Sequence, residues 1–225
     1  TAYDQGRFDV HLIIPRNRPA PYQPVLFFPG SGAFNNERPF PQGLTTSEAG
    51  PWTQPSFIVG DGRAIIWPVY YGSFERSINA DIYRNAQWFT RAVQDGLRTV
   101  DYIATRDDLE LQKLAYLGQS LGVIVGPFIT GLEPRFQAGI FYHGGLIENL
   151  SPPPQFDGLS FAPRVKFPIL MINGRNDGLF NVVTSQEPLF HFLGSSPSEG
   201  LLICPMVGPD ADSKRSNWID VTTLG

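Results

Sequence analysis

The sequence contains little cysteine, little histidine and little charge. Its single cysteine, Cys204, excludes an internal disulfide and a zinc site built from several thiolates. Charged residues make up 17% of the 225 residues and the formal net charge is −4, which argues against a nucleic-acid-binding protein with a basic face. The longest apolar run, at 121–129, is about half as long as a membrane-spanning helix. No signal peptide is visible. We therefore expect a soluble protein without a membrane span, while its compartment and oligomeric state stay open.

Glycine and proline are abundant, with 23 and 21 residues, and they separate short apolar segments. Such unbroken apolar runs are typical of strands buried on both faces of a parallel sheet. We predict strands at residues 8–15, 25–28, 63–69, 113–117, 136–142, 167–172 and 201–205. Helices are expected at 81–105, from the end of the 118–122 motif to residue 132, at 182–193 and at 212–224. This alternation predicts an α/β fold, with a mostly parallel sheet and helices on both faces, in one domain spanning 1–225.

Two segments add detail to this prediction. Residues 146–164 are rich in proline and lack periodicity, so we expect a small inserted cap or lid loop there. The helix 81–105 carries apolar residues at spacings of three and four, which predicts one continuous buried face made of Ile82, Ala86, Phe89, Val93, Leu97, Val100 and Ala104. Within this helix, Gly96 is expected to cost about 1 kcal/mol relative to alanine.

Residues 118–122 read Gly-Gln-Ser-Leu-Gly and match the pattern G-x-S-x-G. A predicted strand precedes the motif and a helix follows it, so Ser120 is expected on a tight turn with its hydroxyl above the sheet. The flanking glycines fit because such a turn leaves no room for side chains. The helix N-terminus favours negative charge that develops beside it. The pattern indicates a nucleophilic serine, and the alternative is an ordinary tight turn that contains a serine.

A serine nucleophile needs a base, and the base needs an acid that orients it. In folds with this motif the acid follows the serine in the chain. Asp177 lies just after the predicted strand 167–172, in a glycine-containing turn, so it is the predicted acid. The alternative role for Asp177 is to cap the helix that follows. Asp157 fits less well because it lies in the proline-rich insertion.

The oxyanion formed in acyl transfer needs backbone N–H donors that are already in place. The first donor is expected from Leu121, directly after the serine. The second is expected from the loop at residues 29–32, Pro-Gly-Ser-Gly, where we favour the N–H of Ser31 over a plain glycine-rich turn. This chemistry implies no cofactor and no metal.

Together these segments resemble the α/β-hydrolase superfamily, and within it the bacterial dipeptidyl-aminopeptidase/acylaminoacyl-peptidase-like serine hydrolases. The resemblance covers most of the chain and is carried by FFPGSGA at 27–33, RAIIWPVYYGSFER at 63–76, KLAYLGQSLG at 113–122, FAPRVKFPILMINGRND at 161–177 and SQEPLFHFLG at 185–194. It implies an α/β-hydrolase fold, shortened at the amino terminus relative to the full superfamily sheet. It also implies serine hydrolase activity on an acyl ester or amide.

The sequence departs from this family at the catalytic base. The family carries its histidine in a Gly-His pair after the last strand, which is the segment 201–205 here. Pro209 occupies that position, and no histidine follows His191. Because proline accepts no proton, this replacement predicts weak catalysis, supported mainly by oxyanion donors and substrate binding.

Three histidines are present. His11 and His191 are expected away from the site, on an early strand and on the outer layer of the sheet. His143 follows the strand expected beside the nucleophile strand, so its ring should open onto the rim where ligands bind in α/β sheets. His143 is therefore the candidate surrogate base, although Asp177 is expected on the other side of the pocket. No histidine is expected to bridge the serine and the acid.

These observations predict a serine hydrolase that cleaves an acyl ester or amide through an acyl-enzyme on Ser120. Its expected partner is a small acyl substrate, not a nucleic acid. One alternative is a degenerate hydrolase fold that binds a ligand or partner without turnover. The other is a chain altered at its carboxyl terminus. Ester or amide preference and acyl specificity stay open.

Overall fold

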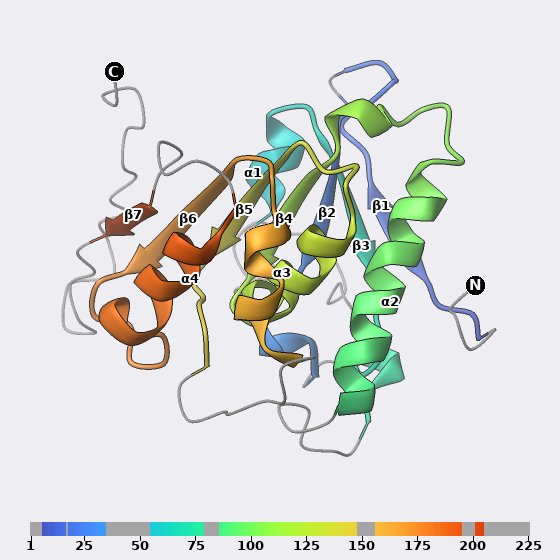
Figure 1. The fold of residues 1–225 in the computed structure, drawn as a ribbon. Coiled ribbons are helices and arrows are strands. Elements are labelled where there is room, and N and C mark those ends of the chain that lie inside the picture. The colour runs from blue at the N-terminus through green and yellow to red at the C-terminus, as the bar shows by residue number, and fades with distance from the viewer. Residues whose placement is uncertain are drawn as a thin grey trace, which may run out of the picture.

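The seven predicted strands form one sheet in the computed structural model, which describes residues 6–16, 18–34, 55–78, 86–147, 156–194 and 201–204. The strands are β1 (Val10–Ile13), β2 (Pro24–Phe28), β3 (Ala64–Pro68), β4 (Ala115–Gln119), β5 (Ala138–Tyr142), β6 (Ile169–Gly174) and β7 (Leu201–Cys204). Their order is β1-β3-β2-β4-β5-β6-β7, and only the β1–β3 pair is antiparallel. The predicted, mostly parallel α/β sheet is confirmed (Figure 1).

Helices cover both faces of the sheet, as predicted. They are α1 (Ser56–Gly60), α2 (Ala86–Ile103), α3 (Leu121–Leu132) and α4 (Glu187–Phe192). Figure 1 shows α2, α3 and α4 together on one side. Leu26 and Phe28 of β2 face this layer, whereas Val25 and Phe27 belong to a second apolar cluster with Ile58 of α1. The short α1 is an element that the sequence did not predict, and the predicted helix 212–224 lies outside the described residues. Among the described helices, none is both long and apolar enough to cross a bilayer.

The buried face of α2 is rotated from the predicted one. Phe89, Val93 and Val100 are buried as predicted, Leu97 is half-buried, Ala86 and Ala104 are exposed, and Ile82 lies outside the described residues. The observed face also includes Trp88, Ala92, Asp95, Gly96, Thr99 and Ile103.

Close packing at Gly96 and a buried ion pair at Asp95 explain this rotation. A Cβ atom on Gly96 would lie 2.9 Å from Cδ1 of Ile129, so this glycine lets α2 approach α3 closely. Asp95 is only 2% exposed. It turns inward because Arg76 Nη1 and the Tyr71 N–H donate to its Oδ2 at 2.6 and 2.8 Å. Glycine and aspartate are therefore part of the packed face, although neither belongs to the apolar pattern.

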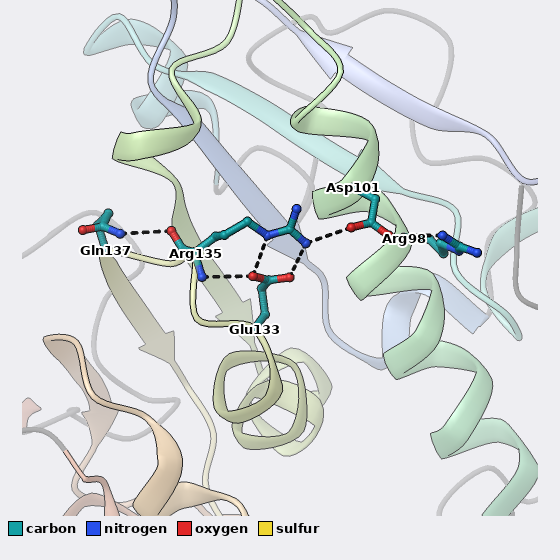
Figure 2. A network of polar contacts seen from close by, with 5 residues as sticks. All are labelled: Arg98, Asp101, Glu133, Arg135 and Gln137. Atoms are coloured by element: carbon teal, nitrogen blue, oxygen red, sulfur yellow. Dashed lines mark hydrogen bonds and ion pairs between the residues drawn. The ribbon is translucent and has the colours of Figure 1, made fainter.

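A charged network ties α2 to the segment between α3 and β5 (Figure 2). The Glu133 side chain is only 5% exposed, and the Arg135 guanidinium donates to its two oxygens at 2.7 and 2.5 Å. Arg135 also donates to Asp101 of α2 at 2.8 Å. A carboxylate tolerates such burial only when it is paired and hydrogen-bonded. Arg135 therefore compensates the charge of Glu133 and links α2 to the segment that follows α3.

Replacing this arginine, as Arg135→Met, is expected to lower the free energy of unfolding by roughly 1–3 kcal/mol, because the Glu133 carboxylate stays buried without its partner. Urea unfolding followed by circular dichroism measures the loss. Lys113→Met removes an exposed pair with Glu110, at 3.0 Å, and should change the stability by less than about 1 kcal/mol. Equal losses in the two variants would contradict the proposed role of Arg135.

Candidate active site

Ser120 lies at the junction between β4 and α3 in a strained backbone conformation. Its φ and ψ are 50° and −107°. Among the described residues, the non-glycine residues with positive φ are Phe74, Ser120 and His143. Such strain persists only where the surroundings enforce it, and it is frequent at functional sites. Here the Ser120 N–H donates to the Tyr142 carbonyl at 2.9 Å, which fixes the turn against the end of β5.

Glycines surround Ser120 because backbone segments approach closely there. A Cβ atom on Gly122 would overlap the Phe28 carbonyl oxygen, and one on Gly118 would lie 2.6 Å from the Gly122 oxygen. The expectation that the flanking glycines leave no room for side chains is confirmed. A Cβ atom on Gly30 would lie 3.2 Å from Ser120 Cβ and 3.7 Å from its Oγ, so the loop after β2 directly contacts the serine.

The two expected oxyanion donors lie in segments that meet at Ser120. Leu121 is the first residue of α3, so its N–H has no acceptor within the helix and lies at the positive end of the helix dipole. Ser31 is the first residue of a 3-10 turn (Ser31–Phe34). It directly follows Gly30, the residue that packs against Ser120.

Three candidate side chains lie at the same edge of the sheet. Ser120 follows β4, His143 follows β5, and Asp177 lies three residues after the end of β6. These strands are adjacent and parallel, so their carboxyl ends meet at one edge. The His143 N–H extends the pairing of β5 by donating to Ile172 at 2.8 Å.

Asp177 contacts His143, contrary to the expectation that it lies across the pocket. Its Oδ1 accepts the N–H groups of Leu179 and Phe180 at 2.8 and 2.9 Å. Its Oδ2 is buried, has no well-formed hydrogen bond within the described part of the chain, and lies 3.3 Å from His143 Nδ1. The expectation was wrong because β5 lies between β4 and β6, so a residue after β5 lies between the serine and the acid.

The candidate serine and the candidate base are not hydrogen-bonded to each other. Within the described residues, the Ser120 hydroxyl makes no hydrogen bond, so His143 does not bridge Ser120 and Asp177. With Nδ1 next to the carboxylate, Nε2 is the ring nitrogen that remains for a substrate or for the serine. The His143 side chain is 44% exposed, whereas that of Asp177 is 4% exposed. Hydrogen bonds of catalytic groups are often long without substrate.

The other sequence candidates lie elsewhere. His11 is on β1, opposite Trp67, and His191 is exposed on α4. Asp157 accepts the Leu159 N–H at 3.0 Å and caps a short 3-10 turn. Pro209, expected at the position of the histidine in the resembled family, lies outside the described residues.

No protein-family model matches the chain, and no curated protein matches it in sequence. Solved structures do match. The acetyl xylan esterase from Paenibacillus sp. R4 has a TM-score of 0.65 and 15% identity, covering 91% of this chain and 75% of that one. Est1E from Butyrivibrio proteoclasticus, solved with ferulic acid bound, has a TM-score of 0.63 and 13% identity, covering 87% and 84%. The acylaminoacyl peptidase of Pyrococcus horikoshii has a TM-score of 0.62 and 17% identity, covering 87% of this chain and 34% of its own.

The chain has the α/β-hydrolase fold. Three buried polar residues near the candidate site were missed by sequence reasoning. Asn173 Oδ1 accepts the Gly144 N–H at 2.8 Å, and Ser185 and Gln186 bond to neighbouring loops. The last two fall in the predicted helix 182–193, which is a π-helical turn (Val182–Gln186) followed by α4. Pro188, in the first turn of α4, is the signal that separates the two elements.

The contact between Gly122 and β2 leads to a stability prediction. In Gly122→Ala the new Cβ atom would overlap a backbone oxygen of Phe28, which cannot rotate away. We expect the free energy of unfolding to fall by about 3 kcal/mol in urea titrations. Gly178→Ala is the control, because its Cβ atom would meet nothing within 4 Å, and it should change stability by less than about 0.5 kcal/mol. Similar losses in both variants would refute the close approach at Gly122.

Proposed function

We propose that this α/β-hydrolase is a serine hydrolase that cleaves an acyl ester or amide through an acyl-enzyme on Ser120. The observation that carries the proposal is the strained φ of 50° at Ser120, at the amino end of α3 and on the same sheet edge as the His143–Asp177 contact. Solved structures of the same fold include esterases, an acylaminoacyl peptidase and a puromycin hydrolase. Because one fold hosts many functions, the proposal rests on the site and the fold only supports it.

The reaction follows from the positions of these groups. Ser120 Oγ attacks the substrate carbonyl carbon while its proton passes to His143 Nε2. The N–H groups of Leu121 and Ser31 stabilise the resulting oxyanion. The tetrahedral intermediate collapses, the bond to the leaving group breaks, and the leaving group takes the proton from Nε2. Water then attacks the acyl-enzyme with His143 again as the base, which releases the acid and restores Ser120.

In this proposal Asp177 acts through His143. The carboxylate 3.3 Å from Nδ1 favours the tautomer that carries its proton there, so that Nε2 is free to accept one. It also stabilises the imidazolium that forms during attack. We expect turnover slower than the median enzyme rate of about 10 per second, because the base is 44% exposed and Ser120 has no preformed bond to it.

Labelling with a fluorophosphonate probe tests the nucleophile. We expect mass spectrometry to find the adduct on the peptide that contains Ser120, together with slow hydrolysis of p-nitrophenyl acetate. Ser120→Ala should lose both, whereas Ser160→Ala, at an exposed serine, should keep both. An adduct on Ser31 or Ser73 would refute the assignment. Absence of both labelling and turnover in the parent protein would favour a degenerate fold that only binds a ligand.

A double-mutant cycle tests the base and the acid. We expect His143→Gln and Asp177→Asn each to lower kcat/KM for p-nitrophenyl acetate by roughly 100-fold, since a positioned base contributes about that much or more. The double variant should be no slower than His143→Gln, because the two residues act as a unit. His191→Gln, on the exposed side of α4, is the control and should leave the rate unchanged. Wild-type rates in folded His143→Gln protein would place the base elsewhere.

A further inference from the structure

We propose that Ser185 and Gln186 are positioning residues that hold the loops of His143 and Asp177 in contact. Both residues are fully buried and belong to the π-helical turn Val182–Gln186. The catalytic meaning of this inference rests on the proposed function, whereas the positioning itself rests on hydrogen bonds and packing alone.

Gln186 fixes the loop that carries the acid. Its Nε2 donates to the Gly174 carbonyl at 3.1 Å and to the Phe180 carbonyl at 2.6 Å. These two carbonyls stand on either side of Asp177, and the Phe180 N–H itself donates to Asp177 Oδ1 at 2.9 Å. The Gln186 side chain therefore connects both ends of the loop that carries Asp177. The backbone of this loop in turn holds the Asp177 carboxylate.

Ser185 fixes the turn that follows the base. Its Oγ donates to the Leu146 carbonyl at 2.5 Å. A Cβ atom on Gly145 would overlap this Oγ and would lie 3.4 Å from the Gln186 nitrogen. The chain after His143 thus passes directly over the Ser185–Gln186 peptide. Because the two positioning residues are adjacent, a single rigid peptide unit holds both loops.

Backbone and side-chain hydrogen bonds to Asn181 close the turn that carries both side chains. The N–H groups of Ser185 and Gln186 both donate to the Asn181 carbonyl at 3.0 Å. The Asn181 side chain caps the same turn by accepting the N–H groups of Val183 and Thr184 at 2.9 and 3.3 Å. π-Helical turns are rare and frequent at functional sites, which fits a turn used for positioning.

The contacts with the acid loop use only the amide nitrogen of Gln186. Two carbonyl acceptors require a group with two donors, which an amide nitrogen supplies and a carboxylate does not. Within the described residues, the Gln186 Oε1 is buried without a hydrogen bond. Gln186 therefore leaves one acceptor unpaired while its amide nitrogen closes the loop that carries Asp177.

Histidine-ring NMR measures this positioning independently of turnover, because the chain has three histidines and His143→Gln assigns the signal of interest. We expect the ring ¹⁵N and ¹H signals of His143 to shift in Gln186→Met and Ser185→Ala, in the direction seen for Asp177→Asn, while the signals of His11 and His191 stay in place. Thr130→Val is the matched control. It removes a buried hydroxyl bond, to Gly126 at 2.7 Å near the far end of α3, and should shift none of the three.

Activity provides a second readout where the parent protein turns over p-nitrophenyl acetate. Gln186→Met should lower kcat by roughly 10- to 100-fold with KM unchanged, because the displaced groups are catalytic rather than substrate-binding. It should have no further effect in the Asp177→Asn background. Ser185→Ala, the milder change, decides the question if Gln186→Met does not fold. Unshifted His143 signals in the folded variants would overturn the proposal, whereas shifted signals without turnover in the parent would overturn only the proposed function.

Discussion

The parallel pairing of β4, β5 and β6 determines which side chains the candidate site contains. Gln119 pairs with Tyr142, and Tyr142 pairs with Ile172, so the three strands reach the same edge of the sheet in register. Neighbouring strands lie about 4.8 Å apart, which places residues that follow the two outer strands roughly 10 Å from each other. A side chain after the central strand lies between them. His143 occupies that position, and its contact with Asp177 follows from the strand order.

The same edge of the sheet is tightly packed, as the two glycines after His143 show. A Cβ atom on Gly144 would lie 2.5 Å from Val123 Cβ of α3, and one on Gly145 would overlap Ser185 Oγ. The pair of glycines after His143 therefore passes between α3 and the π-helical turn. This double constraint fits the positive φ of 53° at His143, a conformation that is uncommon for residues other than glycine.

The sequence predicted the strands well because parallel strands buried on both faces are short apolar runs between turn residues. It also placed Ser120 and Asp177 after the correct strands, since the motif and the glycine-containing turn mark those positions locally. The contact of His143 with Asp177 could not be predicted, because it depends on which strand lies between two others. The positions of Ser185 and Gln186 in a π-helical turn could not be predicted for a different reason. Such a turn next to a helix has nearly the same periodicity as the helix. The buried Asp95 shows a third limit. A carboxylate interrupts the apolar pattern of a helix face, so its burial cannot be predicted until its arginine partner is known.

Stability and catalysis make different demands on the His143–Asp177 pair. A buried carboxylate oxygen without a donor costs roughly 1–3 kcal/mol or more, and Nδ1 of His143 is the nitrogen placed to supply that donor. A protein that only bound a ligand would gain from the pair in the same way, so the pair alone does not argue for chemistry. The strain at Ser120 differs, because a φ of 50° costs energy and the Ser120 hydroxyl makes no hydrogen bond within the described chain to repay it. Stability explains the acid and the ring that covers it, whereas the strained backbone of the serine is the feature that supports the proposed nucleophilic role.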